Sequence, residues 1–373
     1  MSLSLDELTR AFLTEQGIPE GSAPTVFKAP AVDADPEAPL VHLDLKDWVN
    51  LAKARKSHPE GARFAESYHF LREATERGKV QVVLSGALYM ELSMAIPGER
   101  HRTDLADVMS EITRFRSLNS RARLLEAQAD SVLRQMLGRP AASSHTPVVG
   151  HGCYFAFEGR ELRTRLSGLS DEVLADYYAL RDMPTLLYRA AEMMEWMLLR
   201  GVTPEQGAEI SGYSTVEVSN MERDRIAREQ DFSRLLQESP GLRRKLESVI
   251  LGRELFAELG NELPRLLTRM GASVDDFVQL SAERIAKFAG GIPVLLVQTA
   301  LRRQHHANSS REFKSNDLRD IDQMSVAVPC CDIVVTEKHS IDALKRMKLD
   351  ERLETRFLKS VDQLPAAIQD LRR

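Results

Sequence analysis

The chain has 373 residues, of which 43% are hydrophobic and 28% charged, and its formal net charge is −5. These values are typical of a soluble globular protein and exclude a polycationic nucleic-acid binder, so any contact with nucleic acid must use a local basic patch. Three cysteines, Cys153, Cys330 and Cys331, give neither a disulfide framework nor zinc-ligand spacing. No signal peptide and no apolar run long enough to cross a bilayer are expected, which predicts a cytoplasmic protein without a membrane partner.

The expected elements begin with a short helix at 4–16 and a proline-rich arm, which together occupy residues 1–38. Residues 40–45 (LVHLDL) predict a buried strand, and a helix should begin at Lys46. Another helix, from Pro59 to Gly78, precedes a second buried strand at 80–84 (VQVVL). Ser85 is a favoured N-cap for the helix that follows. Strands that alternate with helices predict a parallel sheet.

Helical periodicity dominates residues 100–295, apart from a loop expected at 138–159. Strand patterning returns at 331–336 (CDIVVT) and more weakly at 356–358 (RFL). The sequence therefore predicts an α/β fold. Residues 39–99 and 296–373 should form a parallel-sheet core that is interrupted by a large all-α insertion at 100–295.

Acidic residues occupy positions that these elements should bury. Asp44 ends the first strand, and ligands of open α/β sheets bind outside the carboxyl ends of strands. Capping of the next helix is the alternative role for Asp44. Glu91 lies on the shoulder of the apolar face of the helix at 85–96, where a carboxylate needs a partner, either a cation or a neighbouring arginine.

The segment 316–328 (NDLRDIDQMSVAV) predicts a buried helix with Asn316 as its N-cap. Asp317 lies in line with the apolar stripe and Asp320 lies beside it, whereas Asp322 should face solvent. The helix dipole stabilises an anion there by only about 0.3–1 kcal/mol, against several kcal/mol for burying it. Mg²⁺ or Mn²⁺, which prefer oxygen ligands, would explain two carboxylates at this place.

Taken in order, these motifs resemble the PIN-domain family of metal-dependent nucleases. They are LDL with Asp44, SGALYMEL with Glu91, DIDQMSVA with Asp320, and IVVTEK with Thr336 and Glu337. The resemblance covers residues 40–100 and 296–373 and implies a PIN-like core. It implies that the catalytic residues are Asp44, Glu91, Asp317 and Asp320, which with Glu337 would bind Mg²⁺ or Mn²⁺. Two features depart from the family pattern: the last acid, which is usually Asp, is Glu337, and the insertion is long.

A basic run, LRRQHHANSSREFKSNDLRD, leads into the acidic helix. A cationic run beside an acidic site suits a phosphate backbone, although a solvated helix face is the alternative. The candidate phosphate-binding residues are four members of this run, together with the lysine that follows Glu337. They are Arg303, Arg311, Lys314, Arg319 and Lys338.

Within the insertion, residues 203–223 resemble the helix-turn-helix unit of phage-type repressors. Capping-box patterns flank an SGY turn, but Glu217 and Glu222 match DNA poorly, and an ordinary helical hairpin would show the same pattern. The Met- and aromatic-rich stretch 177–197 favours core packing or a protein partner.

These observations predict a cytoplasmic metal-dependent endonuclease, a hydrolase that acts on RNA. A toxin-like or defence role is compatible with them, with the insertion providing specificity or binding an inhibitor protein. The alternative is a non-catalytic regulator that binds nucleic acid or protein through a PIN-like scaffold and the helix-turn-helix-like insert.

Overall fold

The computed structural model describes residues 26–27, 37–96, 98–142, 146–159, 164–165, 183–201, 215–308 and 311–371. The helix expected at 4–16 lies outside these residues. So do residues 203–214 of the helix-turn-helix-like unit and the start of the stretch 177–197.

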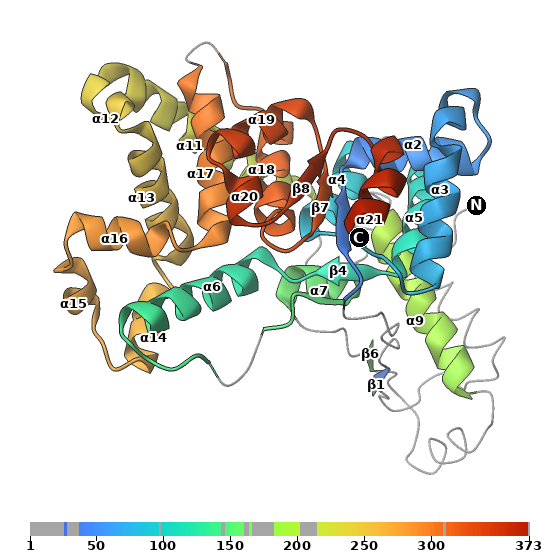
Figure 1. Ribbon diagram of the computed structural model, residues 1–373, viewed down its shortest axis with the longest axis horizontal. Coiled ribbons are helices and arrows are strands. Elements are labelled where there is room, and N and C mark those ends of the chain that lie inside the picture. Colours follow the sequence, from blue (N-terminus) through green and yellow to red (C-terminus); the bar gives the residue numbers. More distant parts are fainter. Residues whose placement is uncertain are drawn as a thin grey trace.

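A four-stranded parallel sheet lies at the centre of the molecule (Figure 1). Its strand order is β3-β2-β7-β8, so segments from opposite ends of the chain lie side by side. The expected α/β class and parallel sheet are confirmed. The strands are β2 (Leu40–Leu43), β3 (Gln81–Val83), β7 (Ile333–Val335) and β8 (Arg356–Leu358).

The strand residues alternate between two separate cores, because successive side chains point to opposite faces of a sheet. Val41 and Leu43 of β2 belong to one hydrophobic core, which also receives alternate residues of β3 and β7. Val83 and Val334 belong to the other core, and His42, in register with both, lies between them. Both faces of the sheet are therefore covered, as is usual for parallel sheets.

The first core is covered by helices from the N-terminal part of the chain and by the C-terminal helix. In Figure 1 these helices lie on the opposite side of the strands from the helices of residues 246–307. They are α2 (Leu45–Arg55), the 3-10 helix η1 (Pro59–Phe64), α3 (Ala65–Glu76), α4 (Gly86–Ala95), α5 (Glu99–Thr113), the 3-10 helix η2 (Val361–Gln363) and α21 (Leu364–Leu371).

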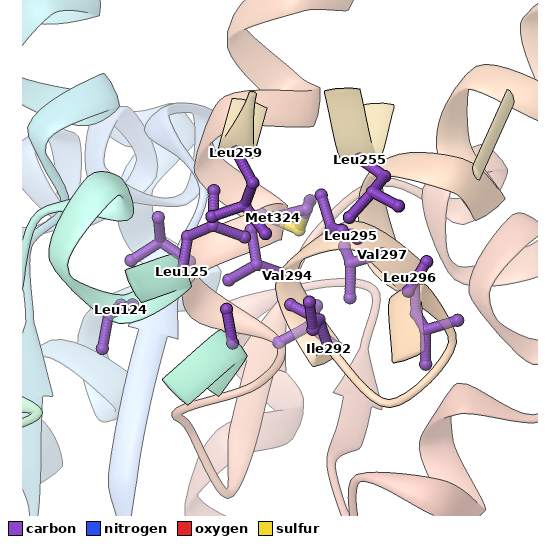
Figure 2. Packing of buried hydrophobic residues seen from close by; sticks show 14 of the residues in the cluster. Leu124, Leu125, Leu255, Leu259, Ile292, Val294, Leu295, Leu296, Val297 and Met324 are labelled. Carbon is purple, nitrogen blue, oxygen red and sulfur yellow. The ribbon is translucent and has the colours of Figure 1, made fainter. Parts of the chain in front are cut away.

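The second core joins the sheet to the insertion. Figure 2 shows leucine, isoleucine, valine and methionine side chains from two helices within the insertion meeting side chains from residues 292–297 and from Met324. Because this core is continuous, the sheet and the insertion share buried surface. The helices are α6 (Arg121–Met136), α13 (Leu246–Leu259), α17 (Pro293–Ala307), α18 (Ser315–Ala327), α19 (Lys338–Arg346) and α20 (Leu349–Arg352).

The remaining described helices are α7 (Gly152–Glu158), α9 (Met183–Arg200), α11 (Thr215–Glu238), α12 (Pro240–Arg244), α14 (Leu263–Arg269), α15 (Val274–Val278) and α16 (Ala282–Ala289). Among described residues, no single helix is long and apolar enough to cross a membrane. The bent pair α16 and α17, which meet at 96°, passes such a test by length and composition alone.

Residues 100–295 are not wholly helical, which corrects the expectation from sequence. They contain β4 (Arg116–Leu118), β5 (Val149–His151) and β6 (Thr164–Arg165), the last of which pairs with β1 (Val26–Phe27). β4 is antiparallel to β5 and joins the edge of the main sheet through a parallel bridge between Leu84 and Ser117. The sheet layer therefore continues beyond residue 99.

Two expectations for the acidic helix also need correction. α18 begins at Ser315 with Lys314 as its N-cap residue, so Asn316 lies inside the first turn. Asp322 does not face solvent, because Arg225 of α11 and Arg121 of α6 form ion pairs with it. The apolar periodicity of α18 alone predicts that this side of the helix faces solvent, but a helix of the insertion covers it.

Candidate functional site

The chain changes direction across the sheet between β2 and β7, because β3 follows β2 on one side and β7 lies on the other. In open α/β sheets, such a switch point leaves a crevice outside the carboxyl ends of the two strands. Asp44 directly follows β2, and Thr336 and Glu337 directly follow β7. The backbone N–H of Asp44 donates to the carbonyl of Val335 at 3.1 Å, which fixes these two strand ends beside each other.

Two helices bring further carboxyl groups to this edge. α4 follows β3 with Ser85 as its N-cap, as expected, and the Ser85 hydroxyl accepts from the N–H of Leu88. Glu91 lies in the second turn of α4. α18 leads into β7, so its N-terminal half, which contains Asp320, lies at the same edge of the sheet and packs against α4.

The pKa shifts show that these acids interact. Burial and the charge of Asp44 raise the pKa of Glu91 to about 7. Burial, Asp44, Glu91 and Glu337 raise the pKa of Asp320 to about 7 as well. Burial raises the pKa of Asp44 too, but Lys46 and the first backbone N–H groups of α2 oppose that rise. The charge of Asp44 therefore opposes ionisation of the other two acids.

Among the described residues, Asp44, Glu91 and Asp320 are in no ion pair, and all three are half-buried. No three His, Cys, Asp or Glu side chains in the described parts of the chain form a ready-made metal-binding arrangement. The three carboxyl groups are thus neighbours whose oxygens are not gathered around one point. Ionised carboxylates without a compensating charge repel each other, and a cation is the group that would draw them together. The donor set fits a hard divalent ion.

The other two candidate ligands differ from these three. Asp317 is buried but already paired: it accepts from Arg311 at 2.6 Å and from the backbone N–H of Lys314 at 2.9 Å. It acts as a cap and ion-pair partner at the start of α18. Glu337 is exposed at the rim, where it pairs with His339 at 3.1 Å while still acting on Asp44 and Asp320 through its charge.

The candidate phosphate-binding residues do not form one patch. Arg319 lies beside the acids, since its charge lowers the pKa of Glu91, but its guanidinium donates to both carboxylate oxygens of Glu222, at 2.8 and 3.0 Å. Arg303 pairs with Glu247 at 3.5 Å and Lys338 with Asp342 at 3.1 Å, both at the surface. Arg311 pairs with Asp317, and Lys314 is exposed.

Sequence reasoning missed two buried polar residues near the site. His42 is fully buried, which lowers its pKa to about 3, and its Nε2 lies 3.4 Å from the Ser85 hydroxyl. Asp47 accepts from the backbone N–H of Val361 at 2.9 Å, and its other oxygen is buried without a hydrogen-bond partner. Burial raises the pKa of Asp47 to about 6. The signal for both was a polar residue inside an otherwise apolar buried run.

Comparison of the chain with protein-family models, with curated proteins and with solved structures gives no match.

Proposed function

We propose that this protein is a metal-dependent endonuclease with a PIN-like core, which hydrolyses phosphodiester bonds of RNA in the cytoplasm. One observation carries the proposal: three carboxyl groups from separate segments, Asp44, Glu91 and Asp320, lie half-buried at the sheet switch point. The charge of Asp44 raises the pKa of Glu91, and both raise the pKa of Asp320. Unpaired acids held together in this way lower stability, and groups with such perturbed pKa values occur preferentially at functional sites. The free state of Cys153, Cys330 and Cys331 agrees with a reducing compartment.

In this reaction the three carboxylates would hold Mg²⁺ or Mn²⁺, with Glu337 as a further ligand at the rim. The chemistry supplied by such an ion is a lower pKa for the attacking water and stabilisation of negative charge on the phosphate. Arg319 would orient the phosphate, because a guanidinium binds phosphate oxygens in a planar, two-point manner. Asp317 keeps its structural place beside Arg311.

The test is cleavage of single-stranded RNA, with single-stranded DNA for comparison, in Mg²⁺ or Mn²⁺. Asp44→Asn should reduce the rate at least a hundredfold, because the side chain keeps its size but loses the charge that holds the cation. Asp370→Asn, which alters a surface ion pair with Arg356 at the N-terminal end of β8 and so at the opposite edge of the sheet, serves as the matched control and should leave the rate unchanged. Cleavage that survives Asp44→Asn, or that persists in excess EDTA, would refute the proposal.

A second candidate function is a non-catalytic regulator that binds nucleic acid or a protein through the insertion. Its support is the pairing of Arg303, Arg311, Arg319 and Lys338 with acids of the chain itself, which leaves little free positive charge at the site. Sequence-specific binding of duplex DNA that is lost on substitution within residues 214–220, without any metal-dependent cleavage, would favour this function. A toxin-like or defence role and an inhibitor protein at the insertion belong to the first proposal as its biological setting.

A further inference from the structure

Helix α11 of the insertion lies along α18 through two ion pairs of opposite polarity. Glu222 of α11 pairs with Arg319, and one turn further along both helices Arg225 pairs with Asp322. Since the residue numbers rise together on the two helices, α11 and α18 run parallel here. The first residues of α11 therefore lie toward the N-terminal end of α18, which is the end that carries Asp320.

The two pairs differ in how firmly they are held. Asp322 accepts from two nitrogens of Arg225, at 2.7 and 2.8 Å, and from Arg121 of α6, which also binds Glu258 of α13. This pair belongs to a network of four helices. Glu222 is held by Arg319 alone among described residues, and the two side chains are 18% and 14% exposed. The ion pair between Glu222 and Arg319, which lies nearer the acids, can therefore break while the Arg225–Asp322 pair still holds α11 against α18.

We propose that Glu222 is a built-in competitor for phosphate at Arg319. The inference rests on the proposed nuclease function and assigns a regulator to that site. Glu222 occupies the Nε and Nη2 edge of Arg319. A phosphate binds such an edge through two of its own oxygens, so a phosphate and Glu222 cannot occupy this edge together. In the free protein Glu222 occupies Arg319, and a substrate phosphate must replace it, while Arg225 and Asp322 keep α11 in place. Through Glu222, the insertion thus lowers the affinity of the protein for RNA.

The experiment measures the affinity of the full-length chain for a single-stranded RNA oligonucleotide in EDTA, so that binding is separated from cleavage. Glu222→Gln should lower the dissociation constant about fivefold, because the competing charge is gone while the side-chain shape remains. It should also steepen the slope of log K against log salt by about 0.7, the value for one additional phosphate contact on a single strand. Glu222→Ala provides a second variant, and thermal unfolding verifies that both are folded.

Two controls show whether Glu222 acts through Arg319. Asp231→Asn removes one negative charge from an exposed ion pair elsewhere on α11 and should leave both quantities unchanged. In an Arg319→Gln background, Glu222→Gln should bring no gain. Equal affinity of Glu222→Gln and the unaltered protein, a gain that persists without Arg319, or the same gain in Asp231→Asn would each overturn the inference.

Metal-dependent cleavage by the unaltered protein separates the two proposals. If the protein cleaves RNA but the Glu222 variants bind no more tightly, only the competitor role fails. If neither cleavage nor RNA binding occurs in any variant, the nuclease proposal fails and the competitor role fails with it.

Discussion

At the residue scale, Asp320 shows how the site affects stability. Its carboxyl ionises at about pH 7 in the folded protein and near pH 4 when unfolded, so the folded state binds the extra proton between those values. The free energy of unfolding must therefore fall as the pH rises from about 4 to 7, and the full cost is present above pH 7. This cost exists because burial and the neighbouring acids oppose the charge.

We therefore expect Asp320→Asn to stabilise the metal-free protein. Because the variant has no carboxyl to ionise, the free energy of unfolding should rise by about 1–2 kcal/mol at pH 8 and change little at pH 4. Urea unfolding in EDTA at the two pH values measures both quantities. An equal change at pH 4 and pH 8 would show that the effect is one of packing and not of charge.

The same residues should make the thermal stability depend on metal. At pH 8, Mn²⁺ at millimolar concentration should raise the melting temperature by several degrees, as expected for a ligand that binds the folded state. The rise should shrink at pH 5.5, because Glu91 and Asp320 then hold protons that compete with the ion. Asp320→Asn should abolish it, whereas Asp317→Asn, which alters the carboxyl paired with Arg311, should retain it. If the rise in melting temperature is lost in both variants, the assignment of Asp320 and not Asp317 as a metal ligand is wrong.

The sequence could predict the position of an acidic residue only where that position is set by local structure and not by helices from distant parts of the chain. Asp44, Glu91 and Asp320 follow from strand ends and helix periodicity, which are local properties. Asp322 could not be placed, since its burial depends on Arg121 and Arg225, which come from helices far away in sequence. The pairing of Asp317 with Arg311 was missed for a different reason: the two residues are close in sequence, but Arg311 precedes α18 and therefore lies outside the helix periodicity.

At the scale of elements, a buried ionic cluster joins three helices of the second core. Glu229 of α11 accepts from Arg302 and His306 of α17 and from Arg253 of α13. Burial alone would raise the pKa of Glu229, but the His306 hydrogen bond and the charges of Arg302 and Arg253 lower it to about 2. Its contribution to stability is therefore complete above about pH 4.5 and is lost as the pH falls toward 2.

Glu229→Gln should thus be strongly destabilising. It leaves the buried guanidinium of Arg302 with only Glu254 as a charged partner, and breaking a buried pair costs about 3–5 kcal/mol. Urea unfolding at pH 7 measures the loss, and the difference between variant and original should shrink between pH 4.5 and 2. Glu247→Gln, which alters a surface pair with Arg303, is the control and should change stability by less than about 1 kcal/mol.

The strands that sequence reasoning predicted and those it missed differ in composition. β2, β3 and β7 belong to the apolar runs expected of buried parallel strands, whereas β8, which begins with an exposed arginine, carries a weaker signal. β4 reads Arg116–Leu118 with a buried arginine and a buried serine, so no apolar run marks it. Its strand conformation comes from its partners, β5 on one side and the bridge to Leu84 on the other.

At the scale of the whole molecule, the sheet depends on both ends of the chain. β2 is central, and its neighbour β7 follows the entire insertion. A chain that ends at Gly290 would lack β7, β8 and α17 to α21, leaving the second core without α17, which packs against α6 and α13. We expect no cooperative thermal transition for that fragment, measured by near-ultraviolet circular dichroism, whereas the full-length chain should show one. A cooperative transition in the 1–290 fragment would contradict the shared core.

The same arrangement has a consequence during protein synthesis. Asp44 and Asp320 leave the ribosome roughly 280 residues apart, which at about 5–20 residues per second corresponds to on the order of 15–60 s. Throughout that time the nascent chain carries only half of the proposed hydrolytic centre. The proposed nuclease would be unable to cleave the messenger or the ribosomal RNA beside it until Asp320 has been synthesised, so the order of segments along the chain would delay the onset of its activity.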